Sequence, residues 1–302
     1  MTKKYCGYIS IIGKPNVGKS TIINSILKKK ISITSRKSQT TRNNILGIKT
    51  VGDKQMIFID TPGMHIKSEK TMNKILNRSA QSIIDDSDII LFVIQRLSFD
   101  KNDELILKKL QESNQKTICI INKIDQVEDK NKLLPFINEI SLKKEFLEIM
   151  LISAKTDNGI DDLVSVIKNN LPENPHIYND GFELEKNNKK FVYSEFIREK
   201  IIRKLGDELP HDTFVEVDKI IDKEDITEVH ATIFVNRKSQ KQIVIGSKGE
   251  VLKDIGKQAR IEIEQQIKRK VFLKTWVKVK KNWNTDSSFI HSLGVGTNYE
   301  SK

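Results

Sequence analysis

The chain has 302 residues and a formal net charge of +12, from 52 Lys or Arg against 40 Asp or Glu. This length allows two domains, each large enough to bury its own core. The two cysteines and five histidines lack metal-ligand spacing, so we expect neither a zinc site nor a Ser-His-Asp triad. The longest apolar run, residues 89–94, is too short to cross a bilayer. We therefore expect a soluble protein of a reducing cytoplasm.

Up to about Leu171, apolar runs alternate with segments of helical periodicity, which is typical of an α/β fold with a mostly parallel sheet. One pair of runs differs, because residues 45–50 and 54–60 are separated by a turn too short for a crossover helix, so we expect an antiparallel hairpin. The other predicted strands are residues 8–12, 117–121 and 149–152, and helices are expected to begin near Lys19, Lys70, Asp103, Asn131 and Ile160.

The second half of the chain is predicted to form a smaller α+β unit. Residues 171–190 are polar and contain prolines, which indicates a linker. Beyond it we expect a helix, strands at 213–221 and 228–236, a long helix and a final strand at 271–280. The apolar side of the long helix, which is expected to face the core, is formed by a stripe of Leu252, Ile255, Ala259, Ile263 and Ile267. No internal repeat is present, which excludes two tandem copies of the first unit.

Residues 13–20, Gly-Lys-Pro-Asn-Val-Gly-Lys-Ser, match the G-x-x-x-x-G-K-[ST] pattern between a predicted strand and a predicted helix. In that context the pattern indicates a P-loop, whose backbone N–H groups and helix N-terminus surround phosphate oxygens. We expect Lys19 to reach the β- and γ-phosphates and the Ser20 hydroxyl to ligate Mg²⁺. The loop alone does not choose between ATP and GTP.

Residues 122–125, Asn-Lys-Ile-Asp, favour guanine. The carboxylate of Asp125 can accept hydrogen bonds from the N1–H and the N2 amine of guanine, and adenine offers no such pair of donors. Asn122 is expected to orient the loop or to touch the base edge, and Lys123 to lie along the ring. Backbone N–H groups of residues 153–155, Ser-Ala-Lys, would close the other side of the base.

Residues 60–63, Asp-Thr-Pro-Gly, follow another predicted strand. Asp60 is expected to hold Mg²⁺ directly or through water, and Gly63 to donate its N–H to the γ-phosphate. Loss of that phosphate would release the segment after Gly63, which would therefore act as a switch. A second switch is expected within residues 31–42, where we favour Thr41 over Thr40 as the Mg²⁺ ligand.

Each of these motifs follows a predicted strand, and ligands of open α/β sheets bind beyond the carboxyl ends of the strands. Four motifs at four such ends therefore predict one crevice with one ligand. Lys19, Thr41 and Gly63 are expected to act in hydrolysis, and Ser20, Thr41 and Asp60 to hold the metal. The expected nucleotide-binding residues are Gly13, Asn16, Val17, Gly18, Lys19, Ser20, Thr21, Asp60, Thr61, Pro62, Gly63, Asn122, Lys123, Asp125, Ser153, Ala154 and Lys155.

The motifs, with residues 31–42, 60–65 and 276–280, resemble the Era family of bacterial GTPases over nearly the full length. The resemblance implies a P-loop GTPase domain at 1–171, a linker at 172–190, a KH-type RNA-binding domain at 191–283 and a tail at 284–302. It implies GTP, GDP and Mg²⁺ as ligands. It also implies binding to the 3′ end of small-subunit ribosomal RNA during maturation of that subunit, and nothing in spacing or charge identifies this RNA.

A G-x-x-G sequence occupies residues 246–249 and precedes the long predicted helix, and this context resembles a KH domain. In KH folds the glycines let the loop approach phosphates, beside a groove for about four unpaired nucleotides. From 241 to 281 there are 12 Lys or Arg against 4 Asp or Glu. The expected RNA-binding residues are Ile245, Gly246, Ser247, Lys248, Gly249, Lys253, Lys257 and Arg260. Phe272, Trp276 and Val279 are expected to pack in the core rather than to stack on bases.

Met64 stands where Ras-like chains carry the glutamine that orients the attacking water, so hydrolysis should be slow unless a partner, a backbone group or a cation completes the site. Asn16 resembles the asparagine that positions K⁺ in related GTPases, which makes K⁺ a candidate activator. One alternative is a passive RNA-binding assembly chaperone in which GTP is mainly structural. Another is a GTPase that uses its basic face on anionic lipid, with peripheral contact to the cell membrane. We expect a monomer.

Overall fold

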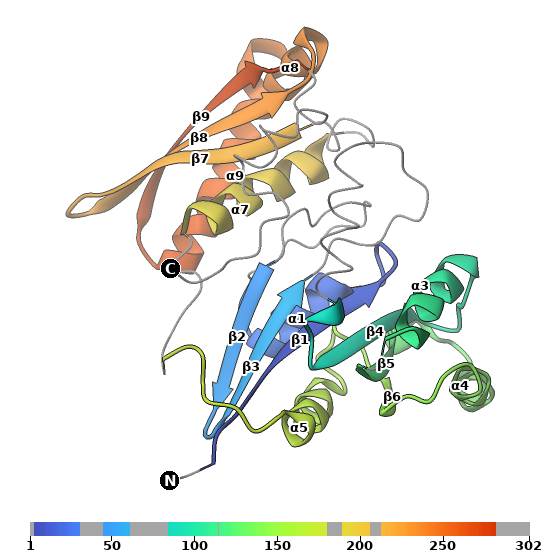
Figure 1. The fold of residues 1–302 in the computed structure, drawn as a ribbon. Coiled ribbons are helices and arrows are strands. Elements are labelled where there is room, and N and C mark those ends of the chain that lie inside the picture. Colours follow the sequence, from blue (N-terminus) through green and yellow to red (C-terminus); the bar gives the residue numbers. More distant parts are fainter. Residues whose placement is uncertain are drawn as a thin grey trace.

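The computed structural model describes residues 3–30, 45–60, 84–113, 115–179, 189–205 and 213–281, which form two units (Figure 1). The first unit contains a six-stranded sheet in the order β2-β3-β1-β4-β5-β6. Its strands are β1 (Tyr5–Gly13), β2 (Ile45–Val51), β3 (Lys54–Asp60), β4 (Ile89–Gln95), β5 (Lys116–Asn122) and β6 (Glu148–Leu151). Neighbouring strands run parallel except β2 and β3, whose antiparallel pairing confirms the predicted hairpin.

Helices cover both faces of this sheet, as predicted for the α/β fold. They are α1 (Lys19–Leu27) and α5 (Ile160–Asn170) on one face, and α3 (Lys101–Gln111) and α4 (Leu133–Ser141) on the other, with short 3₁₀ turns η1 (Ile124–Gln126) and η2 (Lys130–Lys132). Alternate residues of one strand serve the two cores, so that Ile11 packs with α1 and Ile12 with α3. Both cysteines are buried free thiols, and burial raises the pKa of Cys119 to about 12. The helix predicted near Lys70 lies outside the described residues.

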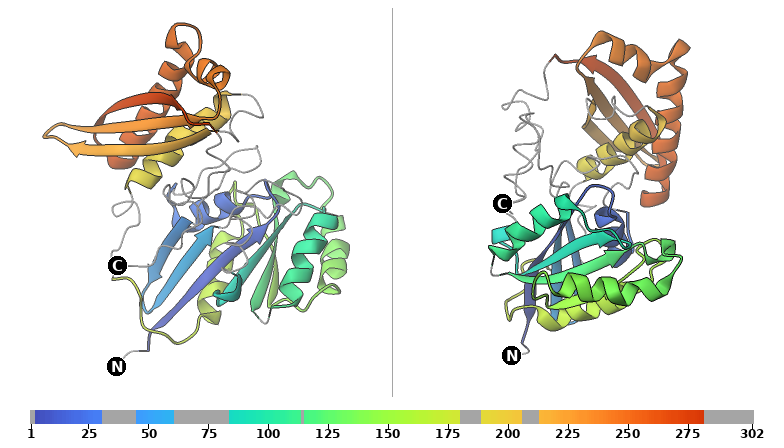
Figure 2. Two further views of the ribbon diagram at one scale, coloured as in Figure 1. Left: turned by 45° about the horizontal axis from the view of Figure 1, so that its top comes forward. Right: turned by 90° about the vertical axis from the view of Figure 1, so that its right-hand side faces the viewer.

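The second unit has three helices packed against one face of a three-stranded sheet, in the order β7-β8-β9 (Figure 2). Its elements are α7 (Lys189–Lys204), β7 (Thr213–Asp222), β8 (Ile226–Val235), α8 (Lys238–Ile245), η4 (Ser247–Gly249), α9 (Glu250–Ile267) and β9 (Lys270–Val279). β7 and β8 are antiparallel, whereas β8 and β9 are parallel. The predicted stripe of α9 packs in this core, with Ile255, Ala259 and Ile263 fully buried.

The expectation that Phe272 and Trp276 pack in the core is wrong. Their side chains are 50% and 38% exposed, on the face of β9 away from the helices. Val271 and Val277, on the opposite face of the strand, are buried instead. Val279, which was also expected in the core, packs against it. Alternation along the strand placed Phe272 and Trp276 on one face, but it did not say which face the helices would cover.

Residues 171–179, the first half of the predicted linker, lie against the first unit at the amino-terminal ends of β1 and β3. The buried side chain of Gln55 on β3 accepts hydrogen bonds from the backbone N–H groups of Ile177 (2.9 Å) and Tyr178 (3.0 Å), and donates one to the carbonyl oxygen of Tyr178 (2.8 Å). Asn174 donates a further bond to the carbonyl oxygen of Cys6. The chain is therefore held on the first unit as far as Tyr178.

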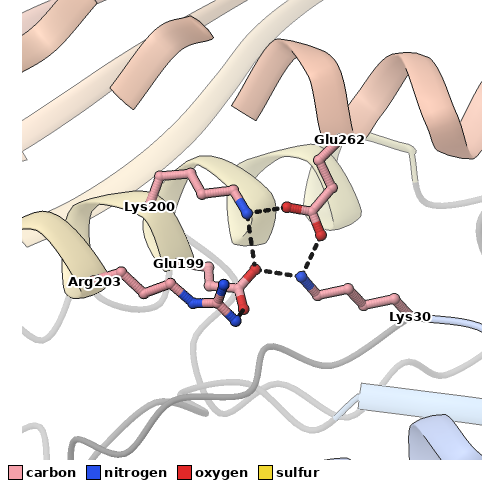
Figure 3. A network of polar contacts seen from close by, with 5 residues as sticks. All are labelled: Lys30, Glu199, Lys200, Arg203 and Glu262. Carbon is pink, nitrogen blue, oxygen red and sulfur yellow. Dashed lines mark hydrogen bonds and ion pairs between the residues drawn. The ribbon is translucent and has the colours of Figure 1, made fainter. Parts of the chain in front are cut away.

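The two units meet at a cluster of charged side chains (Figure 3). Lys30, just beyond α1, forms ion pairs with Glu199 on α7 and Glu262 on α9. Glu199 is fully buried and also contacts Lys200 (3.6 Å) and Arg203 (2.6 Å), and Lys200 contacts Glu262. Burial raises the pKa of Glu262, but Lys200 and Lys30 together lower it by more, so its pKa lies below the usual range. The cluster thus joins one lysine of the first unit to two carboxylates of the second.

We expect Lys30→Met to loosen the contact between the units, because the carboxylates keep Lys200 and Arg203 within the second unit but lose the cation that reaches across. In a double-substitution cycle with Glu262→Gln, the coupling energy for unfolding should be about 1–2 kcal/mol. Small-angle X-ray scattering should show a larger radius of gyration for Lys30→Met. Lys29→Met, which changes an exposed lysine of the same turn, is the control, and identical scattering from both variants would contradict this role of Lys30.

Candidate nucleotide and nucleic-acid sites

The predicted P-loop connects β1 to α1 and has the conformation that its glycines allow. Gly18 is in the left-handed region (φ 105°), and a Cβ atom there would lie 2.2 Å from the side-chain nitrogen of Asn122. Gly18 is also the N-cap of α1, so no side chain of the cap accepts from the first N–H groups, and the first turn holds no acidic residue. The positive end of the helix is therefore directed to the loop, an arrangement that fits a phosphate group.

Lys19 lies over this loop. Its side chain is largely buried, and Nζ donates hydrogen bonds to the carbonyl oxygens of Gly13 (3.0 Å) and Lys14 (2.9 Å). Ser20 and Thr21 follow in the first turn of α1, directly after the loop. The ammonium group is thus held where a triphosphate would bring negative charge.

Asn122, at the end of β5, connects two of the predicted motifs. Its side-chain amide is buried and donates to the carbonyl oxygen of Val17 in the P-loop (2.8 Å). Its side-chain oxygen accepts from the backbone N–H of Ala154 (3.1 Å). Of the two roles considered for Asn122 from sequence, this geometry matches the one that orients the loop.

Lys123 and Asp125 extend these connections. Lys123 has a left-handed backbone (φ 65°), and its Nζ donates to the carbonyl oxygen of Asn16 and to Oε1 of Gln95 (2.6 Å). Burial, with a smaller contribution from Arg96, lowers the pKa of Lys123. One carboxylate oxygen of Asp125 accepts from the hydroxyl of the buried Ser153 (2.7 Å), which orients this exposed carboxylate. Lys155, two residues after Ser153, is exposed.

The structure therefore brings the motifs at 13–20, 122–125 and 153–155 together at one end of the sheet. Asp60 ends β3, next to β1, with Asp60 in register with Ile11. The Asp60 side chain lies outside what the structure describes, as do Thr40, Thr41, Thr61, Pro62, Gly63 and Met64. In the described parts of the chain, no three His, Cys, Asp or Glu side chains gather as a metal site. Of the three predicted Mg²⁺ ligands, Ser20 is the one whose side chain the structure describes, and a hydroxyl oxygen suits Mg²⁺.

One contact of the P-loop was missed from the sequence. Nζ of Lys14 lies 2.7 Å from a carboxylate oxygen of Asp100 and 2.6 Å from one of Asp103, at the start of α3. The Asp103 side chain is fully buried, and its desolvation raises its pKa although Lys14 opposes the shift. Burial alone would lower the pKa of Lys14, and the two carboxylates raise it. The pairing of Asp100 and Asp103 as a capping box was readable from their spacing, but their lysine partner was not.

We expect Lys14→Met to lower the free energy of unfolding of the first unit by about 3 kcal/mol, because it leaves the buried Asp103 without its cation. The double variant Lys14→Met with Asp103→Leu should recover most of this loss, since no uncompensated charge remains. Differential scanning calorimetry of the full chain measures both. If the double variant is as unstable as Lys14→Met alone, the unpaired carboxylate is not the cause.

The G-x-x-G sequence forms a tight connection between α8 and α9. Gly246 is left-handed in φ (73°), and a Cβ atom there would lie 2.4 Å from a methyl group of Val251, so other residues would be strained. Ser247 and Lys248 are exposed at the tip, and Ile245, partly buried, packs against the core of the second unit. Lys253, Lys257 and Arg260 are exposed on α9, opposite its buried stripe. We call these three residues the basic stripe.

Comparison with known proteins identifies both units. A family model described as 50S ribosome-binding GTPase matches residues 8–123, and one described as KH domain matches residues 208–284. GTPase Era of Vibrio parahaemolyticus is 42% identical over 293 residues, which cover 96% of this chain and 91% of that protein. The chain belongs to the Era family of GTPases. GTPase Era of Haemophilus influenzae is also 42% identical, with 97% of both chains covered.

Two solved Era structures match nearly the whole chain with a TM-score of 0.91 at 34% identity, covering 96% of this chain and 99% of each of those chains. One is a variant of Aquifex aeolicus Era bound to GDP·AlF₄⁻, and the other is Era in complex with MgGDPNP and nucleotides 1506–1542 of 16S ribosomal RNA. As an Era-family member, the protein is a GTPase with a G domain followed by a KH domain. Within the described residues, no helix is both long and apolar enough to span a membrane.

Proposed function

We propose that the protein binds GTP at the carboxyl ends of β1, β3, β5 and β6 and hydrolyses it there to GDP and phosphate. The observation that carries this proposal is the bridge of Asn122 between Val17 and Ala154. It fixes the phosphate-binding loop relative to the segment beside Asp125, so one ligand with a base and a phosphate chain fits both. Lys19 neutralises the phosphates, and Asp125 accepts from guanine.

The metal and hydrolysis roles follow from chemistry and from the family. Mg²⁺ would be held by Ser20, Thr41 and Asp60, and Gly63 would donate to the γ-phosphate. A thioether at Met64 cannot orient water, so a cation near Asn16 is our candidate for completing the site. Asn16 has a left-handed backbone (φ 66°), with its carbonyl oxygen bound to Lys123. Faster turnover in K⁺ than in Na⁺ buffer would support this cation, and equal turnover would remove it.

We expect Asp125→Asn to weaken GTP binding about 100-fold or more, because an amide in place of the carboxylate cannot accept from both donors of guanine. The same variant should gain affinity for xanthosine triphosphate, which has an acceptor oxygen where guanine has its amine. Titration with fluorescent nucleotides measures both affinities. Asp129→Asn, the same change of charge at an exposed position nearby, should leave the preference for GTP unchanged. Unaltered specificity in Asp125→Asn would contradict the proposed base contact.

We further propose that the KH domain binds single-stranded RNA at the G-x-x-G loop. Era is known in complex with nucleotides 1506–1542 of 16S ribosomal RNA, and the likeness extends over both domains. For this chain we therefore infer the 3′ end of small-subunit ribosomal RNA as the ligand, and maturation of that subunit in the cytoplasm as the process, carried out by a monomer. The exposed Ser247 and Lys248 would lie on phosphates, with the basic stripe following the backbone.

We expect Ser247→Asp with Lys248→Asp to reduce affinity for single-stranded RNA by about 10-fold or more, because two carboxylates would face the phosphates while both glycines are kept. Fluorescence anisotropy with a labelled oligonucleotide measures this. The control is Lys109→Asp with Gln111→Asp on α3, which makes the same change of net charge on exposed positions of the other domain. GTP affinity should not change in either variant. Equal RNA affinity in the two variants would overturn the assignment of the loop.

A further inference from the structure

The face of the KH sheet that points away from the helices carries aromatic and basic side chains in alternation with the core. On β9 the outward positions are Lys270, Phe272, Lys274, Trp276 and Lys278, all exposed. Phe272 and Trp276 are 50% and 38% exposed, although both rings are large and apolar. We call these five residues the β9 platform. In Figure 1, β9 is the edge strand opposite β7, the strand on which α7 packs.

The Trp276 ring is held in a defined position. Nζ of Lys274 lies 5.0 Å from its ring centroid, and the imidazole of His230 on β8 meets it edge-on, with centroids 5.5 Å apart and an interplanar angle of 71°. A ring held in this way is suited to stack on a nucleobase when the Lys274 ammonium, which lies over the ring in the free protein, turns to a phosphate. The neighbouring carboxylate of Glu228 on β8 is paired with Lys223.

The β9 platform is continuous with the predicted RNA surface. The basic stripe runs along α9 from the G-x-x-G loop and ends at Arg260. Arg260, Lys268 and Lys270 line a shallow open basin of about 600 Å³ at the end of α9, which also contains Glu264. Glu264 accepts a hydrogen bond from the backbone N–H of Val271 and so is partly occupied. Positive side chains thus lead from the loop, round the end of α9, to the first residue of the β9 platform.

We propose that the β9 platform is a second RNA-binding site, which takes the single strand beyond the nucleotides held at the G-x-x-G loop. Bases stack on Trp276 and Phe272, and Lys270, Lys274 and Lys278 contact phosphates. The occupant is RNA because the aromatic rings are interleaved with cations and no carboxylate occupies an outward position of the strand. This inference rests on the proposed RNA binding by the KH domain and lengthens the segment of RNA that the domain binds.

The test measures how the affinity for RNA depends on RNA length, in the full-length protein with and without the aromatic rings of the β9 platform. Single-stranded oligonucleotides of four and twelve nucleotides are titrated against the wild type and against Phe272→Ser with Trp276→Ser. The wild type should bind the longer RNA at least about 10-fold more tightly than the shorter one. The variant should lose most of that gain while its affinity for the four-nucleotide RNA is unchanged.

Two further variants guard against a trivial effect. Leu134→Ser with Leu142→Ser changes two hydrophobic residues of the G domain that are 66% and 89% exposed, and it should keep the gain with length. Lys274→Glu keeps both rings and should reduce the gain and flatten its dependence on salt. Circular dichroism confirms that each variant is folded.

Different failures have different meanings. If the longer RNA gains nothing in the wild type, or if the gain survives loss of both rings, the β9 platform is not an RNA site and this inference is overturned, with the loop assignment intact. If the variant binds both RNAs normally but no longer associates with the small ribosomal subunit, the face contacts protein, which also overturns it. If neither RNA binds the wild type, the proposed RNA function fails first.

Discussion

The side-chain amide of Asn122 is the constraint on which the nucleotide site depends. It accepts from one loop and donates to another, and both partners are backbone groups that are buried with it. Losing either bond would leave a buried polar group without a partner, at a cost of about 1–3 kcal/mol for each group. Because the amide lies against Gly18, the loop can approach it only where no Cβ is present. The glycine and the asparagine, far apart in sequence, therefore require each other.

The sequence predicted most of the fold, because strands buried on both faces and short turns leave strong local signals. The hairpin of β2 and β3 followed from a turn that no helix could fit, and the buried stripe of α9 from its periodicity. Contacts between distant side chains were beyond such signals. Nothing local couples Lys14 to the buried Asp103, since that pairing depends on where α3 begins relative to the P-loop. For Trp276, alternation along the strand showed that Phe272 lies on the same face, but it did not show which face the helices would cover.

Helix α1 connects the phosphate-binding loop to the contact between the domains. It begins with Lys19 and Ser20, and Lys30 follows shortly after its last turn. Nine helical residues span about 13.5 Å, and Ile22, Ile23 and Ile26 are fully buried against the sheet. Such a short, well-packed helix moves as a unit, so the position of the loop and the position of Lys30 are not independent.

On the other side of that contact, α9 has a similar double role. Glu262 meets Lys30 on the inner side of the helix, whereas Lys253, Lys257 and Arg260 are exposed and begin at the G-x-x-G loop. The phosphate-binding loop and the G-x-x-G loop therefore lie at the outer ends of two helices, α1 and α9, which are joined by one ion cluster. If the cluster has different stability in two nucleotide states, RNA affinity must differ between those states by the same factor by which RNA changes nucleotide affinity. The strength of the Lys30 contact sets an upper bound on the coupling that this route can carry.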